Sequence, residues 1–330
     1  MPQPLPIQFQ ATDLESLASA RGRIAVLADP GQTTSPGFRR LDRLAKGALT
    51  RAAGSEAFGK LKPGEAMDLA FPPGLAADAI QIIRLPKKAT QAEARKAGAA
   101  VGRSHGAGGS LVLAEGHAGA ADIAFGLAMR AYDFDTHKSG EKTAPGPVTL
   151  MAAKPEAVAR AAAPMAAVAE GVFFARDLVN EPANVLTTYD FAARLAAMQE
   201  LGLEVEILEE DQLTKLGMGA LLGVGQGSES PSKVVVMQWH GGRKGDAPFA
   251  LIGKGVVFDT GGISIKPAAG MEEMTMDMGG AGVVAGVMRT LALRKAKANV
   301  VGLVGLVENM PDGKAQRPGD VVKSMKGDTI

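Results

Sequence analysis

Short apolar runs bounded by turn residues recur in the first half of the chain, as is typical of buried β-strands. Residues 23–29 (RIAVLAD) and 110–115 (SLVLAE) are two such runs. Residues 91–101 and 120–132 instead place their apolar positions at helical intervals. The pattern therefore predicts a compact α/β domain over residues 1–150.

A long helix is predicted where the pattern changes in the middle of the chain. The segment 133–147 is polar and indicates a boundary, and an alanine-rich apolar segment follows over 154–179. Pro164 is expected to kink or split this helix, because proline removes a backbone donor. Its charges, among them Glu170, favour a helix packed against protein over a membrane span. We assign residues 151–180 to a linking helix.

Strands and helices alternate clearly in the second half of the chain. The pattern predicts helices at 189–201, 211–216 and 280–294, and strands at 204–208, 233–238, 249–258 and 299–307. Strands separated by helices tend to pair in parallel, so we expect residues 181–330 to form a second domain with a mixed, mainly parallel sheet flanked by helices. The predicted fold class is α/β with two domains, of which the N-terminal one is smaller.

Composition narrows the classes of function. The 330 residues include 36 Lys and Arg against 35 Asp and Glu, a net charge of +1, which gives little support for binding nucleic acid or an anionic membrane. The chain has no cysteine, which excludes thiolate metal sites and a cysteine nucleophile. The first ten residues lack the basic start of a signal peptide. We expect a cytoplasmic protein that is not bound to a membrane.

Candidate chemistry gathers in the segment 250–278. Lys254 lies within an apolar strand that leads to Asp259, and Asp277 stands just before a helix that opens with Gly279 and Gly280. Ligands of open α/β sheets bind at the carboxyl ends of strands, which is where Asp259 is expected. Lys266 follows within the same segment and, taken alone, has the character of a surface lysine.

Each of these residues permits a structural as well as a functional interpretation. Lys254 would reach the surface or pair with Asp259; alternatively, burial and a nearby dication would remove its proton and make it a neutral ligand. Asp277 would stabilise the start of the following helix or bind a metal. Carboxylates with an amine suit Zn²⁺, Mn²⁺ or Mg²⁺. The methionines of this segment, Met274 among them, would ordinarily fill a core.

The segment resembles the active-site region of the leucyl (cytosol) aminopeptidases, a family of two-metal exopeptidases. The similarity lies in the order and spacing of four motifs: G-K-G at 253–255, F-D-T-G-G at 258–262, I-K-P at 265–267 and M-D-M-G-G at 276–280. Residues 176–187 (RDLVNEPANVLT) and 308–330 resemble further family patterns. The resemblance therefore covers the chain from about residue 176 onwards.

The resemblance implies a role for each matching residue. Lys254 would be a ligand of one metal, Asp259 would bridge both, and Asp277 would bind the same metal as Lys254, close to the α-amine of the substrate. Lys266 would be the catalytic lysine that polarises the scissile carbonyl, and Met274 would line the pocket for the first side chain of the substrate. The cofactors would be two divalent ions, Mn²⁺ or Zn²⁺, with Mg²⁺ as an alternative.

The same resemblance implies the activity. The protein would be a cytoplasmic metalloexopeptidase, assembled as a homohexamer, that releases Leu-like or Met-like residues from peptides with a free N-terminus through attack of metal-activated water. The second motif of the family, N-T-D-A-E-G-R, supplies further ligands and an arginine and would be expected a few residues after Ile330. We therefore expect a chain that ends at Ile330 to bind metal weakly and to hydrolyse little.

Other functions have weaker support in the sequence. Some members of the family bind DNA, and a DNA-binding or regulatory role is the main alternative, although the net charge of +1 does not favour it. The glycine-rich segments match neither nucleotide-binding motif, G-x-G-x-x-G after a strand or G-x-x-x-x-G-K-[ST]. His240 has no G-x-S-x-G motif to accompany it, so a serine hydrolase is not indicated and this histidine is expected to be structural.

Overall fold

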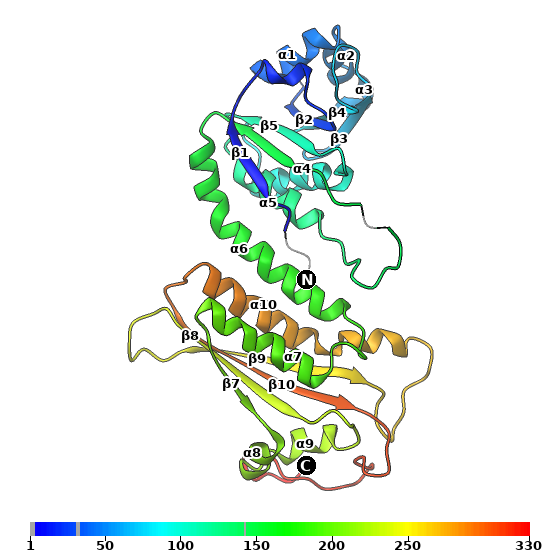
Figure 1. The fold of residues 1–330 in the computed structure, drawn as a ribbon, viewed down its shortest axis with the longest axis vertical. Helices are drawn as coiled ribbons and strands as arrows, with labels where there is room; N and C mark the ends of the chain where they lie inside the picture. The colour runs from blue at the N-terminus through cyan, green and yellow to red at the C-terminus, as the bar shows by residue number, and fades with distance from the viewer. Residues whose placement is uncertain (1–3, 31–33, 142) are drawn as a thin grey trace. The chain divides into compact units, whose positions relative to one another are not determined.

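The chain forms two compact units, each with its own sheet and hydrophobic core. The computed structural model describes residues 4–30, 34–141 and 143–330 (Figure 1). The units comprise Pro2–Ala169 and Glu170–Ile330, so the division falls inside the segment expected to link two domains. Each unit is described by itself below.

A six-stranded sheet organises the first unit, in the order β1-β6-β5-β2-β4-β3. Its strands are β1 (Ile7–Ala11), β2 (Arg23–Ala28), β3 (Ala66–Ala70), β4 (Ala79–Arg84), β5 (Ser110–Glu115) and β6 (Val148–Ala152). Strand β3 pairs antiparallel with β4, and the other pairs are parallel. The helices are η1 (Ser16–Ala18), α1 (Pro36–Leu44), α2 (Ala48–Ala53), α3 (Glu56–Gly59), α4 (Gln91–Ser104) and α5 (Ala120–Arg130). The predicted strands and helices of this half are confirmed.

Helices cover both faces of this sheet. Alternate residues of a strand face opposite sides, so Ile24 and Val26 of β2 join the core that contains side chains of α1, α2 and α3, whereas Ala25 packs with side chains of α4 and α5. Helices α4 and α5 approach closely at Gly98 and Gly126, where an added Cβ would lie 1.9 and 2.0 Å from backbone oxygens. Glycine is therefore required at both positions.

Helix α6 (Pro155–Asn180) runs unbroken through Pro164, so the predicted split does not occur. Proline removes one backbone hydrogen bond, and burial of residues such as Phe174 and Leu178, in the core of the second unit, helps the helix to continue. By length and composition alone α6 could cross a membrane, a test that core helices of water-soluble proteins also pass.

A four-stranded sheet organises the second unit, in the order β7-β8-β10-β9. Its strands are β7 (Glu204–Leu208), β8 (Lys233–His240), β9 (Phe249–Asp259) and β10 (Asn299–Asn309). The sheet is mixed, as expected, but among the described strands its parallel pairing is confined to β9 and β10. The reason is that β8 runs antiparallel to both of its neighbours, β7 and β10.

Helices flank this second sheet as well. They are α7 (Thr188–Ala196), η2 (Ala197–Leu201), α8 (Glu210–Lys215), α9 (Gly219–Gly225), η3 (Met271–Met278) and α10 (Gly279–Leu293). In Figure 1, α7 and α10 lie on one side of the sheet, and α8 and α9 on the other. Val304 and Leu306 of β10 pack in one core with Ala281 and Ala285 of α10. The glycine-rich helix α9 was not predicted.

Close backbone contacts fix α10 between β9 and the C-terminal half of α6. A Cβ at Gly253 of β9 would lie 2.7 Å from the Cα atom of Ala281. On the other side of the helix, a Cβ at Gly171 or Gly286 would lie within 2.3 or 2.4 Å of a carbonyl oxygen of the opposite helix. Because Asp277 comes just before α10, and Lys254 just after Gly253, this packing brings two candidate ligands together.

We predict that Gly253→Ala destabilises the second unit. The new methyl group would meet backbone atoms that cannot rotate away, and overpacking of this kind lowers the free energy of unfolding by about 1–3 kcal/mol. Chemical denaturation measures the change. Gly279→Ala is the matched control, because no atom lies within 4 Å of its added Cβ and alanine is the better helix former. Equal stability of the two variants would contradict the prediction.

We predict that His105, in the first unit, contributes to loss of stability in mild acid. Burial lowers the pKa of its imidazole below the ordinary 6.5, an effect that the backbone of Gly146 partly offsets. The unfolded chain therefore binds a proton that the folded chain excludes, and stability falls as the pH drops below about 6.5. His105→Gln should lose less unfolding free energy than the wild type between pH 7.5 and 5.5, as chemical denaturation at the two pH values can show.

Candidate active site

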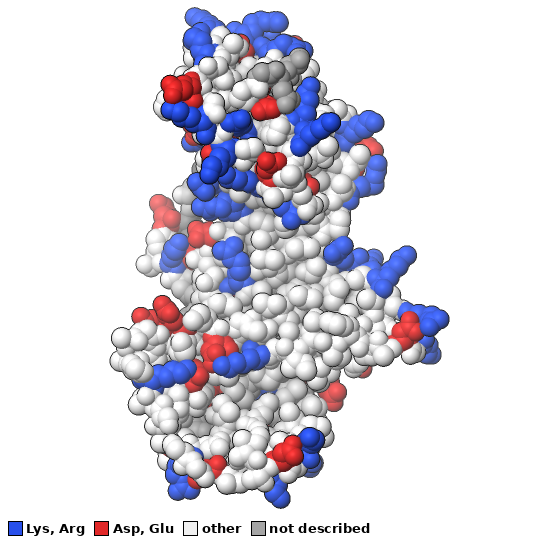
Figure 2. Space-filling model, turned by 180° about the vertical axis from the view of Figure 1, so that it is seen from behind, with Lys and Arg blue, Asp and Glu red and all other residues white. Residues whose placement is uncertain are grey.

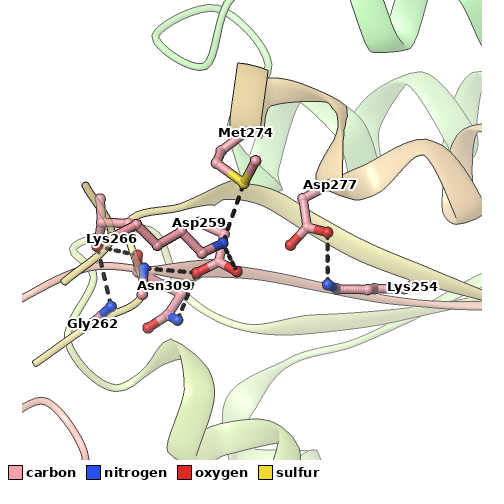
Figure 3. A network of polar contacts seen from close by, with 9 residues as sticks. Lys254, Asp259, Gly262, Lys266, Met274, Asp277 and Asn309 are labelled. Carbon is pink, nitrogen blue, oxygen red and sulfur yellow. Dashed lines mark hydrogen bonds and ion pairs between the residues drawn. The ribbon is translucent and has the colours of Figure 1, made fainter. Parts of the chain in front are cut away.

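Four of the five predicted site residues form two lysine–aspartate pairs on one strand and the segment that follows it. Lys254 and Asp259 belong to β9, Lys266 lies in the loop after that strand, and Asp277 belongs to η3 (Figure 3). The two pairs are Lys266 with Asp259 and Lys254 with Asp277, each with an Nζ–Oδ distance of 2.6 Å. The local chain path thus gathers residues that are up to 23 positions apart.

The carboxylate of Asp259 accepts three hydrogen bonds. Lys266 Nζ donates to Oδ2 at 2.6 Å. The Gly261 N–H and Asn309 Nδ2 both donate to Oδ1, at 2.9 and 2.8 Å respectively. Its side chain is only 16% exposed. Burial acts to raise the pKa of this carboxyl, but the three donors outweigh it and hold the pKa below its usual 3.8. Asp259 is therefore an ionised, firmly oriented carboxylate.

A tight turn after β9 returns Lys266 to Asp259. The Thr260 N–H and hydroxyl both donate to the carbonyl of Asn309, at 3.0 and 2.8 Å, and the Lys266 N–H donates to the carbonyl of Thr260 at 2.8 Å. Gly261 and Gly262 have φ values of +90° and +67°, which favour glycine. The F-D-T-G-G sequence therefore builds the turn that closes the Asp259–Lys266 pair.

Met274 of η3 lies against this pair. Its sulfur is 3.2 Å from Lys266 Nζ (Figure 3). The methionines of this segment were expected to fill a core. Met278 does so and is fully buried, whereas Met276 is exposed. Met274 is thus placed beside the ammonium group and not in the core.

The structure distinguishes between the interpretations of Lys254. Its side chain is 60% exposed, as expected of a lysine that reaches the surface and not of a buried amine. Its partner is Asp277, whereas pairing with Asp259 was the alternative considered. Exposure alternates along this part of β9: Ile252 and Lys254 lie on an exposed face, and Gly253 and Gly255 are buried.

Asp277 offers the clearest indication of a cation. Its Oδ1 accepts from Lys254, but its Oδ2 is buried and has no hydrogen-bond partner. A buried carboxylate oxygen without a donor is unfavourable, and a divalent ion would satisfy it. Two carboxylates and an amine are suitable ligands for Zn²⁺ or Mn²⁺, so the residues present fit a metal. Among the described residues, no group of three or more His, Cys, Asp and Glu side chains is arranged for a metal.

Asn309 is a residue of this site that the sequence did not single out. It ends β10, opposite Asp259 in the parallel register, and its side chain donates to that carboxylate. A polar residue at the carboxyl end of the neighbouring strand was the available signal, but the order of the strands was needed to interpret it. His240, in contrast, ends β8 exposed beside Glu204, at 3.3 Å, and takes no part in the cluster.

A cavity of about 340 Å³ opens beside the turn. Its lining includes Gly261, Gly262, Asn309 and, from the C-terminal segment, Arg317 and Asp320. Arg317 pairs with Asp320 at 3.0 Å, which raises the pKa of the guanidinium and lowers that of the carboxyl. The turn after β9 thus borders space that a ligand could enter.

The chain is similar in sequence to known proteins. Residues 173–330 match the model of the cytosol aminopeptidase family, catalytic domain. A probable cytosol aminopeptidase of Cereibacter sphaeroides is 70% identical over the whole chain, which covers 68% of that relative. The corresponding protein of Dinoroseobacter shibae is 65% identical over 98% of the chain and 66% of its own length. The chain thus spans about two thirds of the length of these relatives.

Solved structures are similar as well. The bottromycin maturation enzyme BotP in complex with Mn has a TM-score of 0.74 and 31% identity, over 94% of this chain and 64% of its own. A mutant of tomato leucine aminopeptidase has a TM-score of 0.78 and 25% identity, over 99% of this chain and 67% of its own. The sequence match and the shared fold lead to one conclusion: the chain belongs to the cytosol aminopeptidase family, which is a family of peptidases.

Proposed function

We propose that this protein is a metal-dependent aminopeptidase whose site is formed by Lys254, Asp259, Lys266 and Asp277. The observation that carries the proposal is the buried, unpartnered Oδ2 of Asp277, next to a lysine and in the same cluster as a second oriented carboxylate. The order of these residues along the chain, which resembles that of the family, supports the same assignment.

Three side chains would hold the metal ions. Asp259 would bridge two divalent ions, and Lys254 and Asp277 would bind one of them. Bound ions of this kind lower the pKa of water towards 7 and stabilise negative charge on oxygen. Lys254 would have to be a neutral amine to act as a ligand. Asp277 would also receive the α-amine of the substrate.

Lys266 and Met274 would act on the substrate itself. The ammonium group of Lys266, already held by Asp259, would donate to the carbonyl oxygen of the scissile bond as negative charge develops there. Met274, which contacts Lys266, would line the pocket for the first side chain and favour Leu-like or Met-like residues. One methylene in such a pocket is worth only about 1–3 kcal/mol, so the preference would be broad.

The metal, the assembly and the location belong to the same proposal. Mn²⁺ is the first candidate, because the similar bottromycin enzyme is described in complex with Mn, and Zn²⁺ and Mg²⁺ suit the same donors. The relatives are described as cytosol aminopeptidases, which supports a cytoplasmic protein that acts on peptides. We further propose a homohexamer, on the resemblance to the family alone.

DNA binding remains the less favoured alternative. The net charge is +1, and on the face shown in Figure 2 the Lys and Arg side chains are dispersed among acidic and neutral ones. Binding to phosphates relies on clustered positive charge. A salt-sensitive mobility shift of duplex DNA would be needed to support this role.

The proposal predicts separate effects for the ligands and for the catalytic lysine. Asp259→Asn and Asp277→Asn each remove a carboxylate ligand. Loss of a residue that only hydrogen-bonds to a ligand typically weakens metal binding ~10–100-fold, and these two substitutions should weaken Mn²⁺ binding by more than that. Assayed in a chain that extends past Ile330, Lys266→Met should not weaken Mn²⁺ binding but should lower the turnover of leucine p-nitroanilide ~10²–10³-fold. Electron paramagnetic resonance of free Mn²⁺ and a colorimetric assay measure the two quantities.

A lysine outside the cluster provides the control. Lys244 lies exposed in the loop between β8 and β9, so Lys244→Met should change neither quantity. Full Mn²⁺ affinity in Asp259→Asn or Asp277→Asn, or wild-type turnover in Lys266→Met, would refute the corresponding assignment.

A further inference from the structure

Asn309 makes two separate sets of contacts with the end of β9. Its backbone carbonyl accepts from the N–H and the hydroxyl of Thr260. Its side-chain amide donates to Asp259 Oδ1 at 2.8 Å (Figure 3). The backbone contacts join the two strand ends, whereas the side-chain contact touches only the carboxylate.

We propose that Asn309 is a positioning residue that fixes the orientation of the Asp259 carboxylate. The inference deepens the proposed function, because Asp259 is the residue assigned to bridge the metal ions. Asn309 would not touch substrate or metal itself; it would act through Asp259. Residues that hydrogen-bond to a metal ligand orient that ligand and strengthen metal binding.

The geometry gives the amide a specific task. A carboxylate can rotate about its bond to Cβ, and Asp259 is held against rotation by donors on both oxygens. Oδ1 takes two neutral donors, the Asn309 amide and the Gly261 N–H, which leaves Oδ2 facing the Lys266 ammonium. Without the amide, the neutral donor that remains to Oδ1 is the Gly261 N–H, which lies two residues further along the chain.

Strand register and a neighbouring glycine account for the position of the amide. Asn309 stands opposite Asp259 in the parallel register of β9 and β10, after a shift in register that follows Val307. Gly262 leaves room for the amide, since a Cβ there would lie 2.7 Å from Asn309 Oδ1. The site thus sets both the position and the direction of this donor.

The chain supplies a closely matched control at the opposite end of the same strand. Asn299 begins β10, and its side chain donates to the carbonyls of Arg243 and Asp246 and accepts from the Gly242 N–H. It fixes a loop in the same manner but has no contact with the lysine–aspartate cluster. Asn299→Leu and Asn309→Leu therefore make the same chemical change, with and without an effect on Asp259.

The test compares both variants with the wild type. Asn309→Leu should weaken Mn²⁺ binding ~10–100-fold by paramagnetic resonance, while Asn299→Leu lowers the melting temperature but leaves Mn²⁺ affinity unchanged. In a metal-free crystal structure of Asn309→Leu, the Asp259 carboxylate should be rotated or present in two conformers. Asn309→Ala, which only removes atoms, serves if leucine is not accommodated.

The outcomes separate this inference from the proposed function. An Asp259 carboxylate that keeps its orientation in the Asn309 variant overturns the inference, and so does an equal loss of Mn²⁺ affinity in both variants. A wild-type protein that binds no Mn²⁺, with Asp259 rotated in the Asn309 variant, refutes the metal site while the positioning role stands.

Discussion

The close approach of α10 to β9 is the constraint on which the site depends. Gly253 brings the strand against Ala281 of the helix, and Gly171 and Gly286 allow α6 to press on the other side. Backbone contacts of this kind leave little freedom for sliding, because any side chain would enforce a larger separation. Asp277, two residues before the start of α10, is therefore held at hydrogen-bond distance from Lys254, the residue after Gly253.

The second pair is held by a different device, the turn that follows β9. Thr260 fastens the turn to the end of β10, and two glycines with positive φ reverse the chain so that Lys266 returns to Asp259. One pair thus depends on packing between a helix and a strand, and the other on hydrogen bonds between two strand ends. The site is a product of both, and neither alone brings the four side chains together.

Local patterns were sufficient to predict most elements but not their pairing. The runs at 23–29 and 299–307 are confirmed as strands because their apolar character is a local property. The direction of β8 depends on contacts between segments far apart in the chain, so its antiparallel pairing could not be derived from alternation. Helix α9 was missed because its glycines lower helix propensity, and its formation depends on packing against β10.

The same limit applies to the site. The candidate ligands could be found from the sequence because their order resembles that of a family, and the turn of F-D-T-G-G has local chemistry. The role of Asn309 depends on strand register, which no local pattern contains. The exposure of Lys254 depends on which face of β9 is covered, and that is settled by packing between distant segments and not by the local sequence.

The exposed face of β9 also bears on how the lysine can act. Residues two apart on a strand face the same way, and Ile252 is 82% exposed, as Lys254 is largely exposed. Lys254 pairs there with Asp277, at 2.6 Å between Nζ and Oδ1. Metal ligands must be deprotonated, so the proposed function would require a neutral amine at Lys254 and a new partner for Asp277. The carboxylate of Asp259, in contrast, is already ionised and oriented, because its donors hold its pKa below the usual value. The proposed function therefore requires a rearrangement of the Lys254–Asp277 pair but not of Asp259.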